Sequence, residues 1–353
     1  MKHNSPLFLI DFLKVFAALL IILHHLSSYG QIAEDARRVL PALMTWLFEY
    51  GRYAVQIFLV MAGYLAAQSL SRYANIQFSA NGLLKLILNR YLRLFAPYAA
   101  ALLFTIVCAY IARFWVNDEF VGQSETLGQF LAHLFFIQGI LGLDSISAGA
   151  WYIAIDWQLY SVLAILFVSF PRYQALIWLV SVLAVSSLLF FNRSGDYEAY
   201  FIYFIGSYGL GVLAYLASRF EDVGVRRLAR VALILIGLII AATSLQQLWL
   251  RNILAWFVAL ALYFWGNAYY PKAIAQKNIG KAIAWGSQRS YCAFLIHFAF
   301  ILLANTLYIA SGLHAHESGS FAIALMLGVI IISVIAANYV YRWIEVPANK
   351  LKV

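Results

Sequence analysis

The first apolar stretch of the chain, IDFLKVFAALLIILHH, carries ionisable residues that are unusual in such a segment. Asp11 and Lys14 are three residues apart, so on a helix they share a face and can pair. His25 follows Lys14 by eleven positions, which returns to within roughly 20° of the same direction about 16 Å further along the axis. This stripe could bind an anion and move a proton. Alternatively, Asp11 and Lys14 anchor the helix at a membrane interface and His25 faces lipid headgroups.

A second polar group lies in NRYLRLFAPY, where Arg90 and Arg93 share a helix face just before an apolar run. Guanidinium forks match phosphate in geometry and charge. The pair is therefore a candidate clamp for a phosphorylated ligand that arrives from the cytoplasm. Ordinary anchoring by positive residues at the inner membrane surface explains the same pattern.

A third group opens the run AWYIAIDWQLYSVLAILF, in which Tyr152, Asp156 and Tyr160 follow one another at four-residue spacing on one face. Aromatic residues such as Trp151 are typical of a membrane interface. An aspartate at the apolar entry of a span is costly and favours a functional role. We take Asp156 as a candidate to orient a catalytic imidazole, with Trp151 and Tyr160 as candidate substrate contacts.

The last two polar features lie near the C-terminus. Ser290 and His297, in SYCAFLIHFAFILL, are seven residues apart and share a face, and His297 could be a second polar contact in a cavity. A packed, hydrogen-bonded core histidine is the alternative. Glu345 and Pro347 follow the last apolar run, where a plain helix stop is the simpler interpretation.

The elements that position these residues follow from composition. Hydrophobic residues make up 64% of the 353 residues and charged residues only 11%, whereas a soluble domain carries about a quarter charged residues. The apolar runs are about 20 residues long, which is enough to cross roughly 30 Å of hydrocarbon as helices. They do not alternate as the strands of a β-barrel would. The N-terminal run lacks a small-residue cleavage site, so we interpret it as a span and not as a signal peptide.

One further apolar stretch, 128–143, is short and interrupted by Gly139 and Gly142. If the chain starts in the cytoplasm and this stretch does not cross, the basic loops at 218–230 and 271–289 are cytoplasmic, as the positive-inside rule favours. If the stretch crosses, these loops lie outside. We therefore predict an all-α polytopic membrane protein with ten transmembrane helices, both termini cytoplasmic, and one short re-entrant or interfacial helix on the outer side. The ten spans are expected at about 7–27, 53–71, 94–112, 151–170, 174–191, 199–217, 231–248, 252–270, 290–310 and 320–340.

The cysteines and the net charge indicate which kinds of binding partner to expect. Cys108 and Cys292 lie in apolar runs and form no metal or disulfide pattern, so we predict no metal site. The net charge of +9 reports membrane topology and not nucleic-acid binding. Residues 1–353 are expected to form a single transmembrane domain without an appended soluble domain.

Together these residues resemble the membrane acyltransferase 3 family, bacterial enzymes that O-acylate cell-envelope sugars. The resemblance spans nearly the whole chain, in six short motifs. Two positions depart from the family pattern, which usually has arginine at Lys14 and glutamate at Asp156. The motifs contain Asp11, Lys14 and His25; Phe58, Gly63 and Tyr64; Arg90, Arg93 and Pro97; Trp151, Asp156 and Tyr160; Ser290, Tyr291, Leu295 and His297; and Glu345 and Pro347.

The resemblance implies an integral enzyme of the bacterial inner membrane that moves an acyl group, most commonly acetyl, from cytoplasmic acyl-CoA to a hydroxyl of a glycan or lipid-linked sugar. Acyl-CoA is then a co-substrate, and no tightly bound cofactor is expected. His25 is the candidate base or acyl carrier, with Asp156 and Lys14 in the catalytic group. Direct transfer and an acyl-enzyme on His25 both remain open. The substrate-binding candidates are Asp11, Arg90, Arg93, Trp151, Tyr160 and His297.

Two other classes compete with this interpretation. A transporter or flippase of a lipid-linked sugar would use the same intramembrane polar residues as a substrate path. The chain shows no inverted repeat and no matched pair of broken helices, which are common in such proteins. A non-catalytic membrane scaffold would leave the stripe of Asp11, Lys14 and His25 unexplained.

Overall fold

The fold was analysed in a computed structural model, which describes residues 7–73, 80–117, 119–170, 172–246, 249–271, 274, 277–316 and 318–351. Both chain termini and the last two residues of the span expected at 231–248 lie outside these ranges. The cytoplasmic placement of the termini therefore stays a prediction.

Each of the ten expected spans is a helix, and in the described residues no strand accompanies them. Nine of the helical stretches described here are long and apolar enough to cross a membrane, and α11 is shorter, with 16 residues. The all-α polytopic fold is confirmed, and the count of ten crossings stays a prediction. The helices are α1 (Phe8–Ser28), α4 (Ala54–Leu70), α5 (Ala80–Ala112), α7 (Ala150–Ser169), α8 (Tyr173–Leu189), α9 (Phe201–Arg219), α10 (Val223–Gln246), α11 (Leu250–Trp265), α13 (Asn278–Ala310) and α14 (Gly319–Val340).

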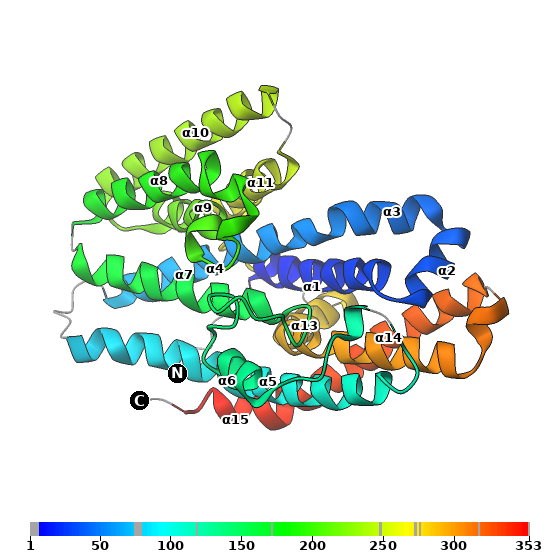
Figure 1. Cartoon of the computed structure of the whole chain (residues 1–353). Coiled ribbons are helices and arrows are strands. Elements are labelled where there is room, and N and C mark those ends of the chain that lie inside the picture. The colour runs from blue at the N-terminus through cyan, green and yellow to red at the C-terminus, as the bar shows by residue number, and fades with distance from the viewer. Residues whose placement is uncertain are drawn as a thin grey trace.

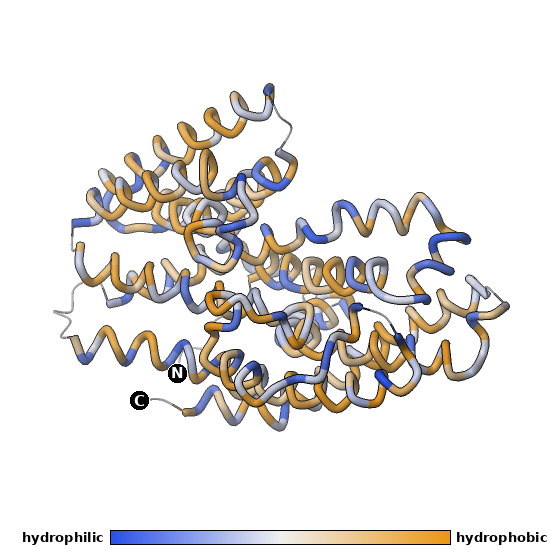
Figure 2. Tube along the Cα trace, in the orientation of Figure 1, coloured by the Kyte–Doolittle hydropathy of each residue, from blue (hydrophilic) through white to orange (hydrophobic). Residues whose placement is uncertain are grey.

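Successive long helices run in opposite directions through the bundle (Figure 1). Helices α8, α9, α10 and α11 gather at the upper left of the view, and α1, α5, α13 and α14 lie below and to the right. The helices are predominantly apolar along their length, as Figure 2 shows. One end of the bundle carries Arg72, Arg219 and Arg226, and we call it the basic end.

Two short helices at the opposite end connect α1 to α4. Helix α2 (Gln31–Val39) is held against α13, because the Tyr308 hydroxyl donates to the buried Asp35 carboxylate at 2.7 Å and Asn305 accepts from the Ile32 amide at 3.1 Å. Helix α3 (Pro41–Tyr50) then leads into α4 through the short turn η1 (Gly51–Tyr53). These contacts fix the C-terminal end of α1, where His25 lies.

Helices α4 and α9 cross closely through two glycines. A Cβ atom at Gly63 would collide with the Tyr208 carbonyl, and a Cβ atom at Gly211 would collide with the Val60 carbonyl. Small residues at a helix crossing let backbones approach and gain van der Waals contact, which drives helix association in membranes. This crossing sets the position of the α4 face that lines the cavity described below.

Gly211→Ala is expected to destabilise the protein by about 1–3 kcal/mol, because the obstructing atoms belong to backbone and cannot turn aside. Thermal unfolding of the detergent-purified protein measures the effect. Gly328→Ala is the matched control, since a Cβ atom there meets nothing within 4 Å. Equal melting temperatures for the two variants would contradict the close crossing.

The stretch expected to be re-entrant or interfacial forms α6 (Leu127–Leu134), which has eight residues and is about 12 Å long. This is too short to cross the membrane. The chain turns back at Phe136, whose φ of 59° is in the left-handed region. Its ring is 1% exposed and packs against Tyr91, Tyr98 and Trp157 of α5 and α7. The turn therefore lies inside the bundle, which agrees with a re-entrant segment.

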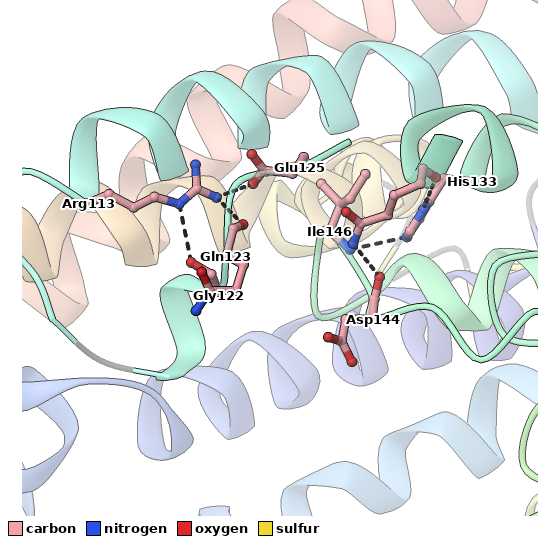
Figure 3. A network of polar contacts seen from close by, with 8 residues as sticks. Arg113, Gly122, Gln123, Glu125, His133, Asp144 and Ile146 are labelled. Atoms are coloured by element: carbon pink, nitrogen blue, oxygen red, sulfur yellow. Dashed lines mark hydrogen bonds and ion pairs between the residues drawn. The ribbon is translucent and has the colours of Figure 1, made fainter. Parts of the chain in front are cut away.

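His133 joins the two arms of this re-entrant segment (Figure 3). Its Nδ1 lies 2.8 Å from the Gln129 carbonyl, and its Nε2 accepts from the Ile146 amide at 3.1 Å. Gln129 Nε2 also donates to the Asp144 carbonyl at 2.8 Å. Because a carbonyl can only accept, Nδ1 carries the proton and the imidazole is neutral. Nearby, Arg113 pairs with Glu125 at 2.5 Å and orders the preceding loop.

Acid is expected to loosen this segment. Burial lowers the pKa of His133 from its ordinary 6.5, and the hydrogen bond to the Gln129 carbonyl offsets this only in part. The unfolded segment therefore binds a proton at a higher pH than the folded one, so stability falls as pH drops below about 6.5. The protection factor of the Ile146 amide, which is its hydrogen-exchange rate corrected for the intrinsic effect of pH, should fall between pH 7.5 and 5.5. In His133→Gln this pH dependence should disappear, and if it persists, other groups cause it.

Candidate active site

A cavity of about 850 Å³ lies between α1, α4, α5, α7, α13 and the C-terminal segment. Tyr73, Asn349 and Leu351 line one end of it, so it faces the basic end of the bundle. Phe58, eleven residues before Ser69 on α4, lies about 16 Å deeper. The cavity brings together polar residues from five separate sequence motifs, namely Asp11, Lys14, Arg90, Arg93, Asp156, Tyr160, Ser290 and Glu345.

Two cations in the cavity wall have no carboxylate within ion-pair distance in the part of the chain that is described. Lys14 is half-buried and projects from α1, and Arg93 is exposed to the cavity from α5. A cation that lines a cavity and is left without a counter-ion attracts anions. Lys14 and Arg93 therefore make the cavity wall attractive to an anion.

Arg90 has a different role from Arg93. Its Nη2 atom lies 2.5 Å from Asp156 Oδ2, and its guanidinium carbon lies 5.3 Å above the Tyr160 ring. The Asp156 side chain is only 4% exposed. A charge-assisted contact this short in a shielded site joins α5 to α7 and neutralises both groups. Of the predicted arginine clamp, Arg93 is therefore the member without a carboxylate partner in the described ranges.

The two other carboxylates of the cavity are also held by neighbours. Asp11 accepts from Ser287 Oγ at 2.5 Å and from the Tyr270 hydroxyl at 3.1 Å, so it does not pair with Lys14 as the spacing allows. Glu345 accepts from the Cys292 thiol at 3.0 Å. Glu345 ends the π-helical segment η7 (Tyr341–Glu345), and such local irregularity is frequent at functional sites.

Three aromatic rings close the deep end of the cavity. Phe58 of α4, Tyr152 of α7 and Phe294 of α13 have ring centroids 5.6–6.0 Å apart. We call them the three-ring cluster. Phe294 also lies 6.2 Å from the His297 ring, so the cluster separates the cavity from the histidines.

His25 and His297 form a direct pair behind this cluster. His25 Nδ1 lies 2.6 Å from His297 Nε2, and the two rings stack within 6° of parallel. His297 Nδ1 lies 2.7 Å from the Phe294 carbonyl. Because that carbonyl can only accept, His297 Nδ1 carries the proton and its Nε2 has a lone pair. His25 must then donate through Nδ1, which leaves the lone pair of His25 Nε2 available as a base.

This arrangement differs from the expectation for Asp156. We predicted that Asp156 would orient the catalytic imidazole of His25. The structure pairs Asp156 with Arg90 in the cavity, and the group that orients His25 is His297. An imidazole can fill this role because it accepts the Nδ1 proton of its neighbour while donating to a backbone carbonyl.

The other predicted residues fall in three places. Six of them line the cavity, namely Asp11, Lys14, Arg90, Arg93, Asp156 and Tyr160. His25 and His297 lie beyond it and are 7% and 0% exposed, so His297 is not a cavity contact. Trp151 stacks on Phe204 at 5.4 Å and lies outside the cavity lining.

Several residues of the site were missed by the sequence analysis. Ser287 and Tyr270 bind Asp11, and Phe294 closes the cavity together with Phe58, which was named only as a motif residue. Serine and aromatic residues are ordinary in membrane helices. Glu345 carried a usable signal, because an acid directly after an apolar run is costly to bury. We favoured a plain helix stop and did not place Glu345 in the site.

The chain matches a family model described as an acyltransferase domain over residues 8–338. The match covers nearly the whole chain and includes every predicted site residue. No curated protein and no solved structure matches the chain.

Proposed function

Because this chain belongs to the acyltransferase 3 family of membrane acyltransferases, we propose that it transfers an acyl group from acyl-CoA to a hydroxyl of a cell-envelope glycan or lipid-linked sugar. Acyl-CoA enters the cavity from the basic end, which is cytoplasmic by the positive-inside rule. The acceptor approaches from the opposite end, where His25 lies at the end of α1. The enzyme then works in the cytoplasmic membrane of a bacterium, with acetyl-CoA as its simplest donor.

The observation that carries this proposal is the order of three features along one path. Two cations without a carboxylate partner among the described residues lie in the cavity wall, the three-ring cluster follows, and an imidazole pair with the lone pair of His25 Nε2 lies behind it. A phosphorylated carrier with a thin, uncharged arm and a reactive end matches this order. Acyl-CoA has phosphates at one end and a thioester at the other.

Lys14 and Arg93 would hold the phosphates of the donor. Arg90 is already neutralised by Asp156, so its contribution is to keep the cavity wall in place. The Ser287 and Tyr270 hydroxyls hold the Asp11 carboxylate, and the Cys292 thiol holds the Glu345 carboxylate. These contacts keep the two carboxylates from pairing with Lys14 and Arg93. The donor site is then open to an anion before it arrives.

His25 would act as the general base. Its Nε2 takes the proton of the acceptor hydroxyl as the oxygen bonds to the thioester carbonyl carbon. The carbon–sulfur bond breaks, and the departing CoA thiolate takes a proton from the imidazolium. His297 holds the His25 ring in the required tautomer throughout.

Lys14→Ala and Arg93→Ala are each expected to weaken CoA binding by about tenfold or more. A hydrogen bond to a charged group contributes about 1.5–3 kcal/mol, and about 1.4 kcal/mol corresponds to a factor of ten. Calorimetry on detergent-purified protein measures the affinity. Pantetheine lacks the phosphates and should bind wild type and variants alike.

Lys281→Ala is the matched control, since Lys281 is an exposed cation near the start of α13 and does not line the cavity. The control should bind CoA as tightly as wild type does. Equal CoA affinity in all four proteins would contradict the assignment of the cavity to the donor. Movement of a lipid-linked sugar without any acyl-CoA consumption would favour a flippase instead.

A further inference from the structure

The three-ring cluster blocks the straight path from the donor cavity to His25. The Phe58, Tyr152 and Phe294 centroids are 5.8, 5.6 and 6.0 Å apart in pairs. Phe294 is 5% exposed and lies one helical turn before His297. Anything that leaves the cavity for the histidine pair has to meet these rings first.

The Phe294 ring packs against the start of α7, next to Gly149. A Cβ atom at Gly149 would lie 2.8 Å from Phe294 Cζ and 3.1 Å from Cε1. Gly149 has a φ of −94°, which alanine can also adopt, so the glycine provides space for the ring and not an unusual backbone. The position of the Phe294 ring is therefore set by the missing side chain at Gly149.

Apolar residues of the cavity lining follow two rings of the cluster along the chain. Met61 and Ala62 follow Phe58 on α4 and Ile153 follows Tyr152 on α7, whereas Lys14 and Arg93 project from α1 and α5. An acyl-CoA molecule held by its phosphates at the cations points its acyl group toward these rings. The acyl group is then the part of the donor that the cluster contacts.

We propose that Phe58, Tyr152 and Phe294 form a size filter that selects short acyl groups on the path from the donor cavity to His25. This inference rests on the proposed acyl-CoA dependence and adds the residues that determine donor specificity. A short acyl group needs one ring to turn aside, whereas each further methylene needs more room between three packed rings. In apolar pockets a single methylene changes specificity by about 10-fold or more.

Two substitutions change the filter in opposite directions. Phe58→Ala removes one ring and widens the passage, whereas Gly149→Ala fills the space beside the Phe294 ring and crowds the cluster. Phe104→Ala is the matched control, because Phe104 is also half-buried and packed against another ring, Phe300, but does not line the cavity. Size-exclusion chromatography establishes that each variant is folded.

The experiment measures kcat/KM for release of CoA from acetyl-, butyryl- and octanoyl-CoA. Phe58→Ala should raise the octanoyl-to-acetyl ratio about tenfold or more over wild type. Gly149→Ala should lower the butyryl-to-acetyl ratio, and Phe104→Ala should leave both ratios unchanged. If Phe58→Ala misfolds, the Gly149→Ala ratio decides alone.

The outcomes separate the filter from the proposed function. Turnover of acetyl-CoA by wild type, with unchanged length ratios in Phe58→Ala and Gly149→Ala, overturns the filter and leaves the transferase standing. Changed ratios in Phe104→Ala equal to those in Phe58→Ala also overturn it, since general loosening would then explain them. If no protein consumes any of the three acyl-CoAs, both proposals fail.

Discussion

His25→Ala is expected to lower acyl transfer by about 10²- to 10⁴-fold, the usual contribution of a general base, while CoA binding stays close to that of wild type. The two effects separate because His25 lies behind the three-ring cluster and does not line the donor cavity. Release of CoA from acetyl-CoA and calorimetric binding of CoA measure them on the same preparation. Parallel loss of binding and turnover would place His25 in the donor site and contradict the geometry.

His297 provides the comparison for this result. His297→Gln can still accept from His25 Nδ1 through its amide oxygen, so activity should fall less than in His25→Ala. His297→Ala removes that acceptor and leaves the buried Nδ1–H of His25 unpaired, so it should cost more than His297→Gln. The ordering of the three variants distinguishes a positioning residue from a residue that only fills space.

Asp156→Ala is expected to destabilise the protein by about 3–5 kcal/mol, because it leaves the Arg90 charge unpaired in a shielded site. Activity should also fall, since Arg90 and Asp156 join the two helices that carry Arg93 and Tyr152. Thermal unfolding in detergent measures stability, with wild type and Lys281→Ala as references. A melting temperature equal to that of wild type would show that the ion pair contributes nothing.

The double variant Arg90→Met/Asp156→Leu tests whether the unpaired charge causes the loss of stability in the single variant. Replacing both partners of a buried ion pair by apolar residues is often neutral for stability, whereas removing one partner is not. The double variant should therefore melt above Asp156→Ala. If it melts at the same temperature, loss of packing and not an unpaired charge explains the single variant.

The sequence predicted the helices well because the bilayer leaves few options. Runs of about 20 apolar residues have to satisfy every backbone group internally, so helices such as α1 and α14 follow directly. The short stretch at 128–143 contains only the eight-residue helix α6, which agrees with the expected short helix, and its non-crossing placement stays a prediction. Boundaries were less certain: the span expected at 252–270 ends as a helix at Trp265, where the chain pairs Tyr269 with Leu7 instead.

The sequence indicated candidate site residues but not which of them pair with each other. The cost of burying charge identified Asp11, Lys14, Asp156 and His25 as residues with a role. Which partner each one takes depends on how helices far apart in sequence meet. His25 and His297 are separated by 272 residues, and Arg90 and Asp156 by 66, so no local spacing could pair them.

The three-ring cluster also could not be predicted from local sequence. Phe58, Tyr152 and Phe294 come from three helices, and each is an ordinary residue for a membrane span. Only their convergence, together with the space left by Gly149, gives them a position on the path to His25. Aromatic richness alone therefore predicts nothing about such a boundary.

Consumption of acetyl-CoA by the purified protein, measured as release of free CoA thiol with wild type beside His25→Ala, tests the central claim most directly. We predict that both proteins bind CoA and that only wild type releases it at an appreciable rate. If neither protein binds or consumes acetyl-, butyryl- or octanoyl-CoA, the cavity does not hold an acyl donor, and the proposed acyl-CoA dependence of this family member is wrong.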